Sequence, residues 1–252
     1  MKAFLAKIFA KYIVNKEQKW INHPLETQDK ILNELIIAAK NTKFGVDHHF
    51  ESIKNYEDFK SQIPINDYEG LKHYFDEVIE GKPDILWPGK PLYLAKTSGT
   101  TSGAKYIPLT KESVPSHINS ARNALLFYIN ETKNSNFVDG KMIFLQGSPI
   151  LEEKNGLKVG RLSGISAHFV PNYLQKNRLP SYETNVIEDW ETKVDRVVDE
   201  TVKADMTLIS GIPPWLIMYF ERLIKVSEKE NVQSIFKNLQ LMVTGGVNLS
   251  LI

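Results

Sequence analysis

The sequence predicts an α/β fold, in which a helix-flanked, largely parallel sheet follows a helical N-terminal region. Two observations carry this prediction. Apolar residues recur at helical spacing over about the first ninety positions, and short apolar runs then alternate with helical stripes to the end of the chain. Helices that alternate with short buried strands are typical of α/β proteins with parallel sheets.

The helical region is predicted from residue spacing. Ile31, Leu32, Leu35, Ile36 and Ala39 recur every three to four positions, and Phe44-Gly45 is the expected stop of that helix. Two further helices are expected over residues 56–62 and 68–80.

The period changes near residue 92. Short apolar runs predict strands at residues 92–95, 106–109, 142–145, 208–209 and 239–244. Helical stripes are expected over residues 113–131, 190–202 and 213–223, the last beginning at Pro213-Pro214. The first two strands flank a Gly/Ser/Thr loop, so the loop is expected to join them.

The N-terminal segment, residues 1–14, mixes Lys2, Lys7 and Lys11 with apolar residues. Such a pattern fits a targeting peptide, a membrane-surface helix, or an amphipathic helix packed on its own domain. Lys7 and Lys11 interrupt any apolar secretory core, so the packed helix is favoured. No uncharged apolar run approaches the about 20 residues that span a bilayer, and we expect no membrane span.

Composition excludes several function classes. Lys and Arg total 31 against 30 Asp and Glu, so no overall field favours nucleic acid as a partner. Cysteine is absent, which excludes disulfides, thiol catalysis and cysteine-ligated metals. A cytoplasmic location is expected.

The segment with the clearest chemistry runs from Thr97 to Lys105, with two glycines, five hydroxyl side chains and a terminal lysine. Glycines let backbone N–H groups converge on an anion, hydroxyls donate further hydrogen bonds, and lysine adds positive charge. The spacing is not that of a Walker A loop, because three residues separate the glycines and Ala104 precedes the lysine. The segment is interpreted as a phosphate-binding loop; a polar hairpin turn is the alternative.

This loop and the residues after it, Tyr106-Ile107-Pro108-Leu109-Thr110, resemble the phosphate loop of the Gretchen Hagen family of acyl acid amido synthetases. These enzymes are relatives of firefly luciferase, acyl-CoA synthetases and peptide-synthetase adenylation domains. The resemblance covers roughly residues 50–248. It includes, in the family's order, Pro64-Ile65 with Tyr68-Glu69, Gly81-Lys82-Pro83, Gly147-Ser148-Pro149, Leu162-Ser163-Gly164-Ile165, Ser210-Gly211-Ile212-Pro213-Pro214-Trp215 and Val243-Thr244-Gly245-Gly246.

The resemblance implies a two-step ligase that uses ATP and Mg²⁺. A small carboxylic acid attacks the α-phosphate of ATP to give an acyl adenylate, and an amine or amino acid then attacks the acyl carbon. The chemistry depends on positioning and charge stabilisation of the phosphates. Lys105 is the expected catalytic residue, and the expected phosphate contacts are Ser98, Gly99, Thr100, Thr101, Ser102 and Gly103.

Two further sites follow from the resemblance. Gly245 and Gly246, directly after an apolar strand, match the place where backbone meets the adenine; a plain strand-end turn is the alternative. Arg122 lies near where family members contact the acyl substrate, and a guanidinium can bind a carboxylate bidentately. A solvated surface arginine is its alternative role.

Other polar clusters receive no assignment. A metal site at Asp47, His48, His49 and Glu51 is not expected, because adjacent histidines rarely converge on one ion. Ser166 and His168 lack a nucleophile elbow. The acidic groups Glu152-Glu153 and Glu188-Asp189-Glu191 are interpreted as solvated faces.

Family members are about twice as long. A downstream glutamate for Mg²⁺, an aspartate for the ribose and a mobile C-terminal lobe have no counterpart here, so residues 1–252 are interpreted as an incomplete nucleotide-side adenylating domain. An acyl-CoA synthetase and a non-catalytic binding or scaffold module are the alternative functions. The sequence does not specify the acid, the amine or the oligomeric state.

Overall fold

The computed structural model describes residues 2–97, 103–170 and 175–245. The fold is α/β, and its residues form two compact units. One unit comprises Met1–Val14, Ala121–Ile150 and Ser166–Ile252 and is called the parallel-sheet unit. The other comprises Asn15–Ser120 and Leu151–Ile165 and is called the hairpin unit. Each unit is therefore assembled from separate stretches of the chain.

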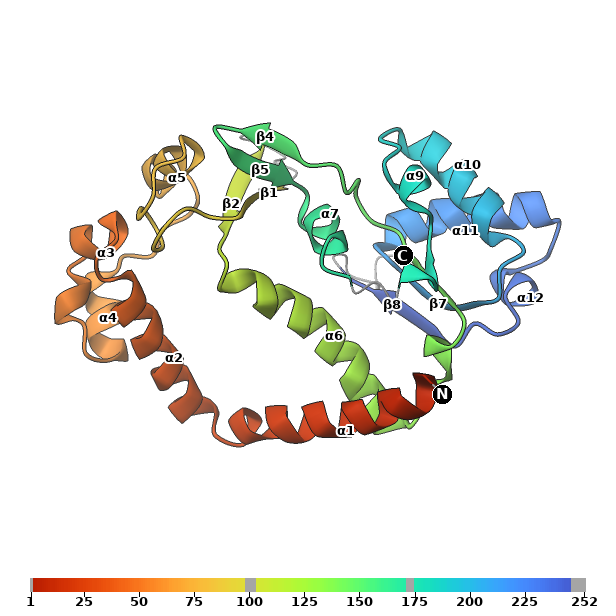
Figure 1. The fold of residues 1–252 in the computed structure, drawn as a ribbon, viewed down its shortest axis with the longest axis horizontal. Coiled ribbons are helices and arrows are strands. Elements are labelled where there is room, and N and C mark those ends of the chain that lie inside the picture. The colour runs from red at the N-terminus through yellow and green to blue at the C-terminus, as the bar shows by residue number, and fades with distance from the viewer. Residues whose placement is uncertain (1, 98–102, 171–174, 246–252) are drawn as a thin grey trace. The chain divides into compact units, whose positions relative to one another are not determined.

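The hairpin unit begins with the helical region that the sequence predicts (Figure 1). Its elements are α2 (Pro24–Ala39), α3 (Lys43–Asp47), the 3₁₀ helix η1 (Phe50–Ser52), α4 (Tyr56–Gln62) and α5 (Lys72–Ile79). Helix α5 begins later than residue 68, because Asp67 Oδ1 accepts a hydrogen bond from Gly70 N at 2.9 Å and closes a turn there. Helix α1 (Lys2–Ile21) precedes α2, and the boundary between the units falls within it.

The prediction that Phe44-Gly45 stops a helix is wrong. Helix α2 ends at Ala39, and Gly45 lies inside α3. Thr42 starts α3, since its Oγ1 accepts a hydrogen bond from Gly45 N at 3.0 Å and donates one to Ala39 O at 2.7 Å. A Cβ at Gly45 would lie 2.1 Å from Ala39 O. Glycine is required here because α3 starts so close to the end of α2.

The sheet of the hairpin unit has four strands in the order β2-β1-β5-β4. They are β1 (Tyr93–Thr97), β2 (Lys105–Leu109), β4 (Glu152–Lys154) and β5 (Leu157–Gly160). Only the β1–β5 pair is parallel; β1–β2 and β4–β5 are antiparallel. Leu94 and Val159 are buried on the face that packs against α5, where Tyr74 and Val78 join the core.

The parallel-sheet unit contains the sheet that matches the sequence prediction most closely. Its strands β3 (Lys141–Phe144), β6 (Arg178–Leu179), β7 (Met206–Gly211) and β8 (Leu241–Thr244) are all parallel, in the order β6-β3-β7-β8. The helices that lie wholly in this unit are η2 (Asn136–Val138), α9 (Tyr182–Asn185), α10 (Trp190–Thr201), α11 (Pro213–Ser227) and α12 (Val232–Ile235). The boundary between the units falls within α6 (Ser113–Thr132) and within α7 (Leu162–Ala167).

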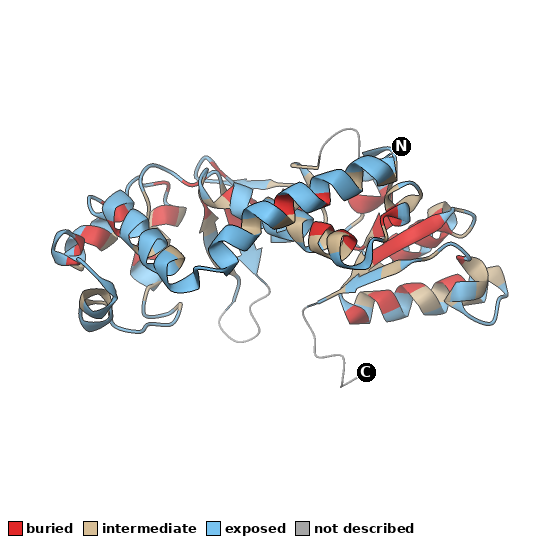
Figure 2. Ribbon diagram, turned by 90° about the horizontal axis from the view of Figure 1, so that it is seen from below, coloured by how far each residue is buried: buried red, intermediate tan, exposed pale blue. Residues whose placement is uncertain are grey.

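This sheet separates two cores. Alternation along a strand sends Met142 and Leu208 to one face, where they pack with residues of α1 and α6. Ile143 and Ile209 point to the opposite face and pack against α10 and α11. Helices α10 and α11 lie side by side, with Trp190 stacked on Trp215 at 4.5 Å between ring centroids (Figure 1). Burial on both faces explains the continuous apolar runs of β3 and β7 (Figure 2).

Candidate functional site

The loop that the sequence singles out joins β1 and β2, as expected. These strands are antiparallel, and the register pairs Thr97 with Lys105, so both ends of the loop are fixed at adjacent backbone positions. Ser98, Gly99, Thr100, Thr101 and Ser102 lie outside the described residues. The sheet therefore defines the base of the loop, which consists of Thr97, Gly103, Ala104 and Lys105.

Gly103 adopts a backbone conformation that favours glycine. Its φ is +85°, and a Cβ built on it would have no neighbour within 4 Å. The requirement for glycine is thus conformational and not a matter of space. This positive φ turns the backbone from the loop toward β2, and it is compatible both with a phosphate-binding loop and with a polar hairpin turn.

Tyr68 holds the lysine end of the loop. Its hydroxyl oxygen accepts a hydrogen bond from the backbone N–H of Tyr106 at 3.1 Å, and Lys105 Nζ lies 5.2 Å from the centroid of its ring. The ring itself stacks on Phe75 at 4.5 Å. Lys105 is half-buried and, within the described ranges, pairs with no carboxylate. An aromatic face positions a cation without neutralising it, so the ammonium keeps its charge for an anion.

Tyr68 is a candidate site residue that the sequence analysis did not assign. It did appear among the family-like segments, as Tyr68-Glu69. Its role could not be inferred from spacing, because it lies 38 positions before the backbone group that it binds.

Arg122 is exposed on α6. Its Nε and Nη2 both donate to Asn123 Oδ1, at 3.1 and 2.8 Å, and the guanidinium lies 5.6 Å from the centroid of the Phe9 ring. The side chain is thus held by neighbours while much of it faces solvent. Its assignment to the acyl substrate stays a prediction.

Gly245 follows β8 directly, as predicted, and is exposed, with nothing within 4 Å of a built Cβ. Gly246 lies outside the described residues. Open space beside the chain is compatible with the approach of a flat base. The adenine assignment stays a prediction for both glycines.

The carboxyl end of β3 meets a cluster of buried polar groups. Lys193 of α10 is buried and donates to Gln146 O at 3.2 Å and to Asn185 O at 2.6 Å. Nearby, His168 Nε2 lies 2.8 Å from Pro149 O. Lys193 and His168 thus hold the family-like segment Gly147-Ser148-Pro149 on either side. His168 therefore has a structural contact with the backbone of this segment.

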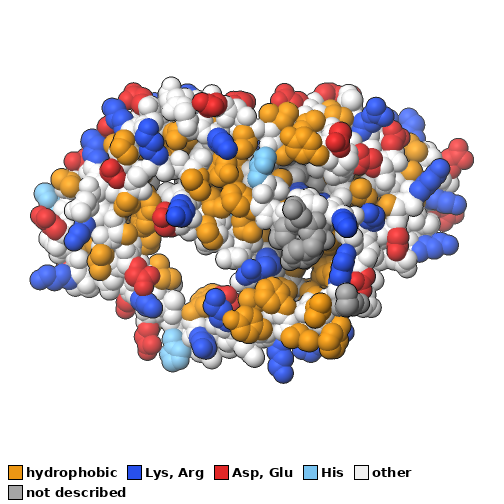
Figure 3. All heavy atoms as spheres, in the orientation of Figure 1, with side chains coloured by type: hydrophobic (Ala, Val, Ile, Leu, Met, Phe, Trp, Pro, Cys, Tyr) orange, Lys and Arg blue, Asp and Glu red, His pale blue; other side chains and the backbone are white. Residues whose placement is uncertain are grey.

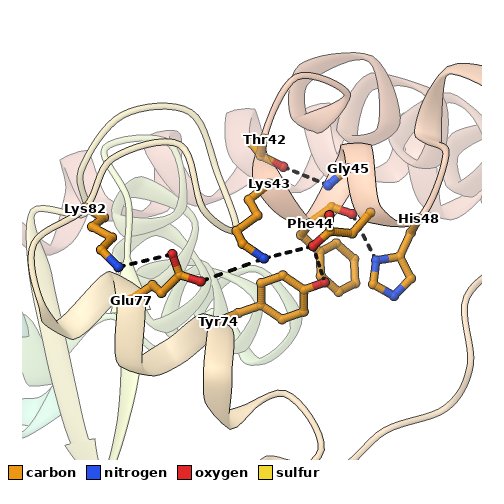
Figure 4. Close-up of polar contacts among 9 residues, drawn as sticks. Thr42, Lys43, Phe44, Gly45, His48, Tyr74, Glu77 and Lys82 are labelled. Atoms are coloured by element: carbon orange, nitrogen blue, oxygen red, sulfur yellow. Dashed lines mark hydrogen bonds and ion pairs between the residues drawn. The ribbon is translucent and has the colours of Figure 1, made fainter.

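The residues around His48 form a structural network, shown in Figure 4. Lys43 pairs with Asp47 at 3.0 Å and with Glu77 at 3.7 Å, and Tyr74 donates its hydroxyl to Asp47 at 2.8 Å. The His48 ring stacks on Phe44 at 4.1 Å between centroids. Among the described residues, no group of three histidines and carboxylates is arranged to hold a metal ion.

Within this network, the pKa values of Tyr74 and Asp47 are shifted in opposite directions. Burial, and then the hydrogen bond to Asp47, raises the pKa of Tyr74 to about 12. Hydrogen bonds from Lys43 and Tyr74 hold the pKa of Asp47 below its ordinary value. The acidic groups that the sequence analysis interpreted as solvated faces are exposed: Glu152 and Glu153 lie on β4, and Asp189 caps α10 by accepting from Thr192 N at 2.9 Å.

The GH3 family N-terminal domain matches residues 14–181, well over half of the chain. This chain belongs to the GH3 family. The match confirms the resemblance drawn from the loop and its accompanying segments, and it includes the entire β1–β2 hairpin and Tyr68.

Two curated plant relatives of this GH3 chain match over shorter stretches. Indole-3-acetic acid-amido synthetase GH3.15 of Arabidopsis thaliana is 29% identical over 106 residues, which is 41% of this chain and 18% of the relative. Probable indole-3-acetic acid-amido synthetase GH3.13 of Oryza sativa subsp. japonica is 36% identical over 58 residues, 22% of this chain and 12% of the relative.

Solved GH3 structures share the fold. The GH3.15 acyl acid amido synthetase superposes with a TM-score of 0.61 at 18% identity, over 77% of this chain and 35% of that one. The AtGH3.15 complex with 2,4-DB gives 0.63 at 18% identity, over 80% and 36%. The chain thus spans about a third of the length of these solved relatives. Within the described ranges, every helix is too short or too polar to cross a bilayer.

Proposed function

We propose that this GH3 chain is the nucleotide-side part of an ATP-dependent acyl acid amido synthetase. It would activate a small carboxylic acid as an acyl adenylate and pass the acyl group to an amine or amino acid. The observation that carries the proposal is the charged Lys105 side chain, held over Tyr68 at the base of a Gly/Ser/Thr loop, in a chain whose family is established.

The residues present fit a polyphosphate. Thr97 and Lys105 are paired across the hairpin, and Gly103 turns the backbone between them with a φ of +85°. An anion bound at this base would meet the Lys105 ammonium. Fixed charges aimed at the phosphates stabilise the charge that develops as the α-phosphorus is attacked.

The roles expected for single residues are part of this proposal. Ser98, Gly99, Thr100, Thr101, Ser102 and Gly103 would contact phosphate, Gly245 and Gly246 the adenine, and Arg122 the carboxylate of the acid. Mg²⁺ supplies charge neutralisation to the polyphosphate when bound, and we assign it no ligand among the described residues. The absence of cysteine is compatible with a cytoplasmic location, which is part of the same proposal.

The test is ATP–pyrophosphate exchange across a panel of carboxylic acids, headed by indole-3-acetic acid and 2,4-DB, the acids named for the relatives. The chain is assayed together with whatever sequence its gene encodes after Ile252. Acid-dependent exchange that Lys105→Ala reduces by about 10²-fold would support the proposal. The matched control is Lys96→Ala, an exposed lysine on the adjacent strand β1.

The two alternatives give different results in the same assay. Exchange followed by transfer to CoA, and not to amino acids, would identify an acyl-CoA synthetase. Binding of ATP without exchange for any acid, at every chain length tested, would favour a non-catalytic module and would contradict the proposal.

A further inference from the structure

Helix α1 carries apolar residues on two opposite faces. One face is buried: Ala10 and Ile13 pack against Leu126 and Ile129 of α6. This contact confirms the expectation that the N-terminal helix packs on its own domain. It accounts, however, for only one side of the helix.

The opposite face presents large apolar side chains to solvent. Phe4, Leu5, Ile8 and Tyr12 are 66%, 56%, 55% and 63% exposed. Because an α-helix advances 100° per residue, positions 4, 5, 8 and 12 form one continuous line, called here the apolar stripe. Figure 3 shows apolar side chains gathered over the N-terminal half of α1, with basic side chains next to them. A contiguous exposed patch of this kind marks an interaction surface.

Lysines border the apolar stripe on both sides. Helical geometry places Lys7 and Lys11 along one edge and Lys2 and Lys16 along the other. No acidic residue occurs between positions 2 and 16, although the whole protein carries a formal charge of only +1. Among the described residues, none of these four lysines lies in an ion pair with a carboxylate. The surface is therefore apolar along its centre and positive along both edges.

We propose that the apolar stripe of α1 binds the surface of a bilayer that contains anionic phospholipid. Aromatic and aliphatic side chains flanked by lysines are the pattern of a helix that lies in the membrane interface, with its apolar face among the acyl chains and its lysines at the headgroups. The buried face keeps α1 attached to α6, so the helix would bring the parallel-sheet unit to the membrane. The apolar stripe, residues 4–12, precedes the region that matches the GH3 domain, which begins at residue 14.

A second copy of this chain is a less suitable occupant. A twofold interface places the same surface on both partners, so the lysine edges of two copies would face each other. Like charges brought together across an interface oppose association. Anionic headgroups complement those same lysines.

The experiment is co-sedimentation of the chain with vesicles of phosphatidylcholine, with and without phosphatidylserine. We expect binding only where phosphatidylserine is present, and weaker binding as salt is raised. Leu5→Ser with Ile8→Ser should reduce the bound-to-free ratio about 10-fold or more, because both side chains lose their apolar contact. Lys7→Glu with Lys11→Glu should reduce it by a similar factor. Both pairs of substitutions leave the buried face of α1 intact, so the circular dichroism spectrum of each variant should match that of the unaltered chain.

Two matched controls lie outside α1. Leu25→Ser with Ile37→Ser alters side chains of α2 that are 74% and 65% exposed, and Lys229→Glu with Lys237→Glu makes the same change of charge elsewhere. Both should bind vesicles like the unaltered chain. Equal loss in these controls, equal binding to neutral vesicles, or dimerisation through the apolar stripe without vesicle binding would overturn the proposal.

Discussion

Tyr68 contacts both the backbone and the charged side chain at the base of the phosphate loop, and these two contacts can be separated. Tyr68→Phe removes the acceptor for Tyr106 N–H and keeps the ring beneath Lys105. Tyr68→Leu removes both. We expect a small rise in the KM for ATP with Tyr68→Phe and a larger one with Tyr68→Leu, measured by pyrophosphate exchange. A cation–π contact at a partly exposed site contributes about 0.5–1 kcal/mol, so the further rise should be about 2–5-fold. Equal KM values in both variants would contradict a role for the ring.

Arg122 provides a test of the acid assignment. Replacing it with Ala should raise the KM for the carboxylic acid more than the KM for ATP, because only the acid would lose a bidentate partner. Loss of the contact with Phe9 alone would alter stability without altering either KM. Exchange measured at varied acid and varied ATP separates these outcomes.

Tyr74 predicts a pH dependence of stability. Its pKa in the folded protein is about 12, against an ordinary value of 10.0. Above pH 10 the unfolded chain loses a proton that the folded chain keeps, so this contribution to stability falls as pH rises toward 12 and amounts to about 2 kcal/mol. Urea unfolding between pH 9 and 11.5 should show a steeper fall for the unaltered chain than for Tyr74→Phe. Parallel curves would contradict the prediction.

At the scale of elements, Gly45 should be among the least replaceable glycines. A Cβ there would lie 2.1 Å from Ala39 O, and backbone cannot move aside as a flexible side chain can. Gly45→Ala should destabilise the protein by about 2–3 kcal/mol, measured by urea unfolding, because α3 would have to shift away from the end of α2.

Gly245→Ala is the matched control, because nothing lies within 4 Å of its built Cβ. Its stability should stay within about 0.5 kcal/mol of the unaltered chain. The same variant also tests the adenine assignment. A raised KM for ATP at unchanged stability would mean that the added methyl group obstructs the nucleotide and not the fold. If both the KM for ATP and the stability are unchanged, the adenine assignment is contradicted and Gly245 belongs to a plain strand-end turn.

The elements that the sequence predicted well have strong periodic patterns. Helices α6, α10 and α11 and strands β3, β7 and β8 lie within a few residues of their expected ranges. Strands β4, β5 and β6 were not predicted. Glu152–Lys154 is exposed on an edge and carries no apolar alternation, and β5 and β6 are too short for a periodic pattern to stand out. The division into two sheets was not predicted either: strand spacing along the chain does not reveal that β5 pairs with β1 and that β3 pairs with β7.

The sequence identified the residues of the candidate site by their types, but it did not reveal which other residues hold them in place. Gly103 and Lys105 were identifiable from residue types, whereas the contact of Lys105 with Tyr68 depends on a fold that brings distant segments together. At two of the clusters that received no assignment, the structure shows a capping contact at Asp189 and ring stacking at His48.

At the scale of the whole molecule, the share of its relatives' length that the chain covers bears on how fast it can exchange pyrophosphate. It spans about a third of the length of the solved relatives. A phosphate site that is open to water is screened and loses electrostatic advantage, whereas residues that close over it restore that advantage. If such residues lie outside positions 1–252, the 252-residue chain should exchange pyrophosphate at least about 10-fold more slowly than a version extended by the sequence that its gene encodes next. Equal rates would show that residues 1–252 suffice.

The way in which the chain is shared between the two units constrains the order of folding during synthesis. The hairpin unit is interrupted by Ala121–Ile150, and its sheet is incomplete until β5 has been made. The parallel-sheet unit needs β7 beside β3, about sixty residues later in the sequence. A ribosome that has released only residues 1–150 therefore exposes two unfinished sheets at once. Such a nascent chain should depend on chaperones until β8 has emerged, and neither unit can be obtained by a single truncation.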